Sequence, residues 1–169
     1  LAQLYDPEEK LFKCWYRTGP LRSPEKIDGH SSYTGYAVSE DGVHWEKPHL
    51  GVFELAGRRD HNVVLVSDGL NPRPRYQQGK KAFIRSVVRH PNPRDESEKY
   101  VCMFFEMSVL GAYLGYSADG IHWRREPKPF WRTLVDVAGW GDDALMGLIY
   151  DRLKERWVMY RRVNPQESE

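Results

Sequence analysis

Three aspartates stand directly ahead of two strand-like segments, and carboxylates in such positions can do chemistry. Asp60 lies just before the segment 62–66, and Asp142 and Asp143 lie directly before the apolar segment 144–149. Burying an unpaired carboxylate at the start of a buried strand costs free energy, so such a group usually has a hydrogen-bonding or charged partner or a functional role. Proton transfer and nucleophilic attack are reactions that such a group supports. The alternative for Asp60 and Asp143 is a cap on a turn or a strand.

Other familiar chemistries have no matching pattern in the sequence. It contains no glycine-rich phosphate loop, no serine–histidine–aspartate signature and no C-x-x-C metal spacing. With 25 basic and 24 acidic residues the net charge is +1, so no global field attracts nucleic acid or an anionic membrane. No apolar run approaches the ~20 residues of a membrane span. We therefore expect no nucleic-acid partner, no membrane contact, no cofactor and no metal, and the cellular compartment stays open.

The elements that must position these acids are indicated by a repeat. Ser-Glu-Asp-Gly-Val-His-Trp at residues 39–45 returns as Ser-Ala-Asp-Gly-Ile-His-Trp at residues 117–123. Asp-Gly between two strand-like segments is typical of a hairpin, because glycine tolerates the positive φ of a tight turn. Serine and aspartate side chains accept hydrogen bonds from turn amides. We therefore interpret His44 and His122 as parts of turns and not as catalytic bases.

A second recurrence extends this unit. The segments 5–16, 90–105 and 150–160 each read as strand, charged turn and aromatic strand. Combined with the Asp-Gly hairpins, they predict a four-stranded antiparallel meander that repeats along the chain. Radially repeated four-stranded sheets are the blades of a β-propeller, so the predicted class is all-β. Cys14 and Cys102 fall in the second strand of successive units and are expected to be buried free thiols.

The unit count predicts about two and a half blades in a single partial propeller domain, whereas closed propellers have roughly four to eight. Residues 1–58 are assigned to the end of one blade, 59–129 to a full blade and 130–169 to the start of the next. We expect either a piece of a larger protein or a homo-oligomer that completes the ring.

These residues resemble the five-bladed β-propeller glycoside hydrolases of the arabinanase, invertase and levansucrase superfamily, in an uncharacterised branch. Besides the Ser-x-Asp-Gly-x-His-Trp hairpins, the segment 60–65 resembles an Asp-Asn-Asn-Ile-Val strand that opens a blade in such proteins. The segment 83–100 resembles their strand, Asp-Pro-Asn turn and Arg-Tyr-Lys strand. The segment 143–162 resembles an Asp-x-x-Asn segment followed by a Tyr-Val-x-Tyr-x-Arg strand.

The resemblance implies a central funnel in which carboxylates act on a glycosidic bond, one protonating the leaving oxygen and another attacking or activating water. It implies that Asp60 and Asp143 are catalytic and that carbohydrate is the partner. The substrate-binding residues that it implies are His61, Asn62, Trp140 and Asp142. Because function is not fixed by fold, the alternative is a non-catalytic propeller module that binds glycan or protein.

The sequence also departs from this pattern. His90 stands in place of the aspartate of Asp-Pro-Asn, and Met146 replaces the asparagine of Asp-x-x-Asn. A third acid has no clear match, although Glu106 is a candidate.

Overall fold

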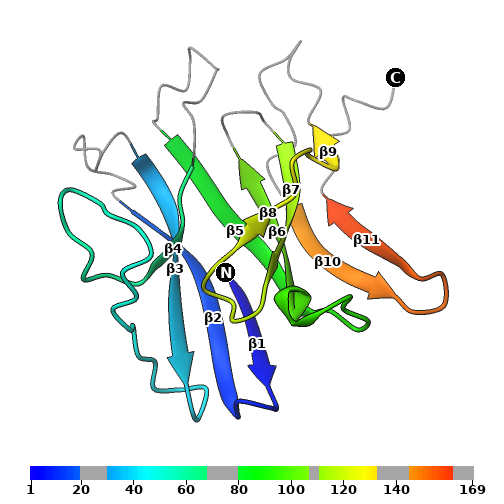
Figure 1. Cartoon of the computed structure of the whole chain (residues 1–169), viewed down its shortest axis with the longest axis horizontal. Helices are drawn as coiled ribbons and strands as arrows, with labels where there is room; N and C mark the ends of the chain where they lie inside the picture. The colour runs from blue at the N-terminus through cyan, green and yellow to red at the C-terminus, as the bar shows by residue number, and fades with distance from the viewer. Residues whose placement is uncertain (20–29, 68–79, 107–110, 133–144, 162–169) are drawn as a thin grey trace.

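The computed structural model describes residues 1–19, 30–67, 80–106, 111–132 and 145–161. Within these ranges the regular elements are eleven strands and one short 3-10 turn, η2 (Glu96–Glu98). Figure 1 shows the strands grouped into three neighbouring sheets, from blue through green to orange. The all-β prediction is confirmed.

The first sheet contains β1 (Ala2–Asp6), β2 (Leu11–Thr18), β3 (His30–Ser39) and β4 (Val63–Leu65). Each strand pairs antiparallel with the next, with β1 on β2, β2 on β3 and β3 on β4. Aromatic and β-branched residues suit such half-buried, pleated surfaces, and Trp15 of β2 lies opposite Tyr36 of β3.

The second sheet repeats this order. It consists of β5 (Lys80–Arg89), β6 (Tyr100–Glu106), β7 (Gly111–Ser117) and, beside β7, the short strands β8 (Arg124–Arg125) and β9 (Trp131–Arg132). All these pairings are antiparallel. A short parallel pairing of β3 with β5 joins the first two sheets. Both sheets thus pair their strands antiparallel in chain order, but the first sheet takes its fourth strand from Val63–Leu65 and not from the segment directly after its Asp-Gly turn.

The third sheet is the hairpin of β10 (Leu145–Asp151) and β11 (Arg156–Arg161). The strands β1, β5 and β10 therefore each open one antiparallel sheet. β5 lies against both β1 and β10, so the three opening strands are neighbours in space (Figure 1).

The strand β4 is placed differently from the prediction. The segment 62–66 was expected to open a blade, but Val63 and Leu65 pair with Gly35 and Thr34 of β3. β4 is therefore the fourth strand of the first sheet, and the second sheet begins at β5. The sequence could not indicate this pairing, because a short apolar run does not by itself reveal which strand it pairs with.

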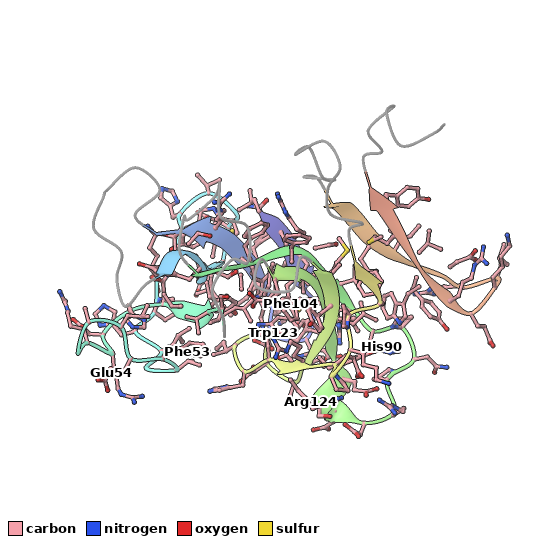
Figure 2. The ribbon with its side chains drawn as sticks, turned by 90° about the horizontal axis from the view of Figure 1, so that it is seen from above. Phe53, Glu54, His90, Phe104, Trp123 and Arg124 are labelled. Carbon is pink, nitrogen blue, oxygen red and sulfur yellow. The ribbon has the colours of Figure 1, made fainter. Side chains whose placement is uncertain are left out.

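Two apolar layers fill the spaces between the sheets. The layer between the first and second sheets includes Trp15, Tyr36, Ile84, Tyr100 and Phe104, with Trp123 packed against it (Figure 2). The layer between the second and third sheets is formed by Phe83, Val101, Met103, Phe105, Ala112 and Leu148. Cys14 and Cys102 are buried free thiols on the second strands β2 and β6, as predicted.

The two repeated turns have the same internal hydrogen bonds. In the first, the amides of Val43 and His44 donate to Asp41 Oδ1, each at 2.8 Å, and the His44 ring nitrogen lies 2.7 Å from Asp41 Oδ2. In the second, Asp119 receives the equivalent three contacts at 2.7, 2.8 and 2.7 Å. The interpretation of both histidines as turn residues is confirmed. The loops are longer than a two-residue hairpin, since Val38 bridges Glu46.

The second turn is also docked on the first sheet. The indole nitrogen of Trp15, a fully buried side chain on β2, donates to the Gly120 carbonyl at 2.7 Å. Gly120 has a φ of 80°, and a Cβ added there would lie 2.7 Å from the Trp15 ring. Glycine is therefore required at this position for its backbone conformation and for the close approach of the indole.

No helix among the described residues is long and apolar enough to cross a membrane.

Candidate functional site

The three sheets meet at a cluster of one aromatic ring and two arginines, which we call the central arginine cluster (Arg17, Phe83 and Arg85). Arg17 comes from β2 of the first sheet, and Phe83 and Arg85 come from β5 of the second. Phe83 packs in the same apolar layer as Leu148 of β10, which belongs to the third sheet. The strands β2, β5 and β10 therefore place this cluster where all three sheets converge.

Both guanidinium groups lie over the same ring. The Arg17 Cζ atom is 4.9 Å and the Arg85 Cζ atom 4.5 Å from the Phe83 ring centroid, within the range of a cation–π contact. Partial burial lowers the pKa of both arginines, and the nearby charge of Arg17 lowers the pKa of Arg85 further. Arginine stays protonated at neutral pH, so the cluster carries two adjacent positive charges.

A buried carboxylate lies at the same end of β5. Glu106 pairs with Ala82 near the start of β5, is 1% exposed and accepts a hydrogen bond from Ser67 Oγ. Ser67 is itself buried and follows β4. Glu106, the candidate third acid from the sequence, is thus enclosed between the first and second sheets.

Asp60 lies away from this convergence. It precedes β4, is exposed, and its carboxylate accepts two hydrogen bonds from the Arg58 guanidinium, at 2.9 and 2.6 Å. These bonds lower the pKa of Asp60 to about 2. Because β4 is a fourth strand, the expectation that Asp60 precedes an opening strand is wrong.

The neighbours of Asp60 have packing and hydrogen-bonding roles. Asn62 Nδ2 donates to the Tyr16 hydroxyl and to the Tyr36 carbonyl, each at 2.6 Å. His61 Nδ1 accepts from the Val63 amide at 3.4 Å, and its Nε2 is buried without a hydrogen-bond partner in the described part of the chain. These contacts tie β4 to β2 and β3, and a substrate-binding role for His61 and Asn62 stays a prediction.

The remaining predicted site residues, Trp140, Asp142 and Asp143, lie outside the described residues. In the sequence Asp143 precedes Leu145, the first residue of β10, by two positions. That the carboxylates of Asp60 and Asp143 lie close enough to act together therefore stays a prediction.

Sequence reasoning missed a buried network of ionisable groups between the first two sheets. The Asp6 carboxylate is fully buried, accepts a hydrogen bond from the Tyr100 hydroxyl and lies 3.1 Å from Lys99 Nζ. Lys13, also buried, donates to the Tyr100 hydroxyl at 3.0 Å and to Glu9 at 2.8 Å. Lys13, which stands between the apolar residues Phe12 and Cys14, was the sequence signal that could have revealed this network.

The network has a clear electrostatic consequence. Burial raises the pKa of Asp6, but the hydrogen bonds from Tyr100, the turn amides and Lys99 outweigh it and hold the pKa well below its ordinary value. Burial and the bond to Asp6 raise the pKa of Tyr100. The charged form of Asp6 therefore stabilises the contact between the sheets.

Beside this network lies a cleft of about 580 Å³, at the far end of β5 from the central arginine cluster. Its lining residues are Glu8, Arg89, His90, Pro93, Asp95, Glu96, Lys99 and Ala118. The cations at its wall are already paired, Arg89 with Glu8 and Lys99 with Asp6, Glu8 and Glu9. These ion pairs indicate a structural cleft more than a ligand site. The described residues also hold no group of three or more histidine, cysteine, aspartate or glutamate side chains that could bind a metal.

His90 replaces an aspartate that recurs where an opening strand ends. Asp6 and Asp151 end β1 and β10, and the Oδ1 atom of each accepts hydrogen bonds from two following amides. After β5, His90 Nδ1 accepts from the Asn92 amide at 3.1 Å instead. Its ring also packs edge-on against Trp157 of β11, with centroids 5.3 Å apart, and Figure 2 shows His90 on the side of the second sheet toward that hairpin. Histidine thus keeps the turn contact and adds packing between sheets.

No family model matches the sequence, and the comparison with curated proteins finds no match. Solved structures do match. An N-acetylgalactosamine deacetylase from F. plautii, in complex with blood group B trisaccharide, is 19% identical with a TM-score of 0.51 over 89% of this chain and 35% of its own. A fructofuranosidase variant from Schwanniomyces occidentalis, complexed with fructosylnystose, is 19% identical with a TM-score of 0.56 over 94% of this chain and 28% of its own.

The chain therefore spans about a third of the length of these neighbours. At this identity the likeness establishes the fold alone. Together with the repeated antiparallel sheets, it shows that the chain has the fold of part of a β-propeller.

Proposed function

We propose that this chain forms part of a propeller funnel that binds a carbohydrate and hydrolyses a glycosidic bond, with Asp143 as a catalytic carboxylate. The observation that carries the proposal is the convergence of the opening strands β1, β5 and β10. Asp143 stands two residues before β10 in the sequence, at the end of that strand where the chain enters the sheet. Asp142 and Trp140 precede the same strand and are proposed to contact the sugar.

Asp60 is not carried into this proposal. Its carboxylate is held by Arg58 on the surface beside β4, and a low pKa suits neither a general acid nor a group that must exchange a proton near neutral pH. The partner acid of Asp143 would then come from elsewhere in the complete ring.

Two variants on either side of β10 test the proposal. Release of reducing ends from fructans, arabinans and other oligosaccharides is compared for the parent chain, Asp143→Asn and Asp151→Asn. Asp151 caps the turn at the other end of β10, so its replacement removes the same charge without touching the proposed site. We expect Asp143→Asn to abolish hydrolysis at an unchanged melting temperature, and Asp151→Asn to keep hydrolysis while lowering that temperature. Unfolding of Asp143→Asn would instead show a structural role.

A second function, a module that binds glycan or protein without catalysis, is favoured by one observation. A glycosidase needs a carboxylic acid whose pKa is raised so that it can protonate the leaving oxygen. The pKa of eight described carboxylates is shifted downward: Asp6, Glu8, Glu9, Asp41, Asp60, Asp95, Glu98 and Asp119. Binding of an oligosaccharide without its hydrolysis would support this second function.

We also propose self-association as one way to complete the ring. Light scattering coupled to size-exclusion chromatography distinguishes a dimer, which could close a funnel from two copies, from a monomer. A monomer would oppose self-association and direct the search for activity to a longer protein.

A further inference from the structure

We infer that the central arginine cluster binds an anionic sugar, one that carries a carboxylate or a sulfate, through Arg17 and Arg85. The inference rests on the proposed function, because it names the substrate class of the same funnel. Its basis is the meeting of two cations from two different sheets over a single aromatic ring.

The first step of the argument is the position of Arg17. It reaches from β2 of the first sheet to the Phe83 ring of the second, yet it remains exposed. Phe83 in turn packs with Leu148 of the third sheet. Arg17 therefore combines access to solvent with a place at the convergence of all three sheets, where a ligand would touch several blades at once.

The second step is the charge of Arg17. It makes no ion pair with any carboxylate in the described part of the chain, whereas Arg58, Arg89 and Arg94 each bind one. Its neighbour over the ring is Arg85, whose pKa is lowered first by burial and further by the charge of Arg17. A bound anion beside Arg17 would supply a counter-charge that no described carboxylate supplies to it.

The third step is the geometry of stacking. A guanidinium that lies over an aromatic ring uses its flat face, and its N–H donors point outward in the plane of the group. Phe83 is 6% exposed, so the ring serves as a support for the arginines more than as a platform for a sugar. Donors arranged in such a fork match the two oxygens of a carboxylate or of a sulfate ester.

Calorimetric titration of the chain with three matched trisaccharides tests the inference. The probes are trigalacturonate, its uncharged methyl ester and a sulfated galactotriose. We expect at least one charged trisaccharide to bind ~10-fold or more tightly than the ester, since a hydrogen bond to a charged group changes affinity by ~10- to 100-fold. The tighter of the two charged probes identifies carboxylate or sulfate as the preferred group.

Three variants assign the effect to the cluster. Arg17→Gln should weaken binding of the charged probe ~10-fold or more, and Arg17→Lys should restore only part of it, because lysine keeps the charge but lacks the fork. Arg152→Gln removes the same charge from the exposed turn between β10 and β11 and should change affinity less than ~2-fold. Melting temperatures of the three variants verify that each is folded.

The outcomes separate this inference from the proposed function. Equal binding of the ester and the charged probes would overturn the anionic class and leave the carbohydrate proposal standing. An equal loss in Arg17→Gln and Arg152→Gln would overturn the assignment to the cluster. Binding of none of the three trisaccharides would count against both.

Discussion

Replacement of Gly120 by alanine adds a methyl group where the second repeated turn contacts the first sheet. The resulting loss of stability shows how tightly this turn is docked on that sheet. Gly42 and Gly120 occupy the same place in the two turns and have nearly the same φ, 76° and 80°. Alanine in this left-handed conformation costs about 1–2 kcal/mol at either position. Only their surroundings differ, so Gly42→Ala is a matched control for Gly120→Ala.

The surroundings predict a clear difference between the two variants. At Gly42 the new Cβ would lie 3.5 Å from the Phe12 ring, an ordinary contact. At Gly120 it would lie 2.7 Å from the ring of Trp15, which is fully buried and bonded to the Gly120 carbonyl, so the indole cannot move aside. Overpacking of this kind costs about 1–3 kcal/mol more.

Urea denaturation followed by tryptophan fluorescence gives the free energy of unfolding of both variants. We expect Gly42→Ala to lose about 1–2 kcal/mol and Gly120→Ala about 2–5 kcal/mol, with similar m-values. Equal losses would refute the claim that the second turn is held against Trp15.

Three further variants test the contacts between sheets. Asp6→Asn should lower the free energy of unfolding by about 3 kcal/mol at pH 7. Because the pKa of Asp6 is depressed in the folded state, the carboxylate stabilises the fold above about pH 4 and loses this contribution as the pH falls further. Denaturation of parent and variant, measured at several pH values, should therefore give converging stabilities in acid. Burial lowers the pKa of His90, and the charge of Glu98 opposes this shift only in part, so stability should fall as the pH drops below about 6.5. His90→Asn should remove this pH dependence of stability, and an unchanged dependence would show that His90 is not its source. Trp123→Ala should lower the free energy of unfolding by about 3 kcal/mol, because its indole packs on Trp15 with 6.2 Å between the ring centroids. The side chain of Trp45 lies in none of the described apolar clusters, so Trp45→Ala serves as the control in thermal unfolding, and an equal loss in both variants would contradict this assignment.

The two matching turns could be predicted from the sequence because their signals are local. Ser39, Asp41 and Gly42 determine the turn through their own side chains and backbone, and the same types recur at 117, 119 and 120. Alternating aromatic residues then indicate the strands on either side. Local chemistry of this kind repeats wherever the same residues repeat.

The location of the site could not be predicted in the same way. The place of Asp60 depends on whether β4 pairs with β3 or opens the next sheet, and both choices suit a short apolar strand. The central arginine cluster depends on Arg17 meeting Phe83, two residues far apart in the sequence and on different sheets. Such pairings arise from the packing of sheets and leave no periodic pattern along the chain.

The Asp6–Tyr100 hydrogen bond has a consequence for the order in which the chain folds. Its two residues are 94 positions apart, and Lys13 joins Tyr100 across 87. Until β6 is made and placed, the Asp6 carboxylate has only its two turn amides and lacks Tyr100 and Lys99, so its burial is unfavourable. The N-terminal sheet is thus expected to stay open during synthesis and to close only after residue 100 has emerged. Contacts of such long sequence separation make folding slow, so the first and second sheets reach the native state together.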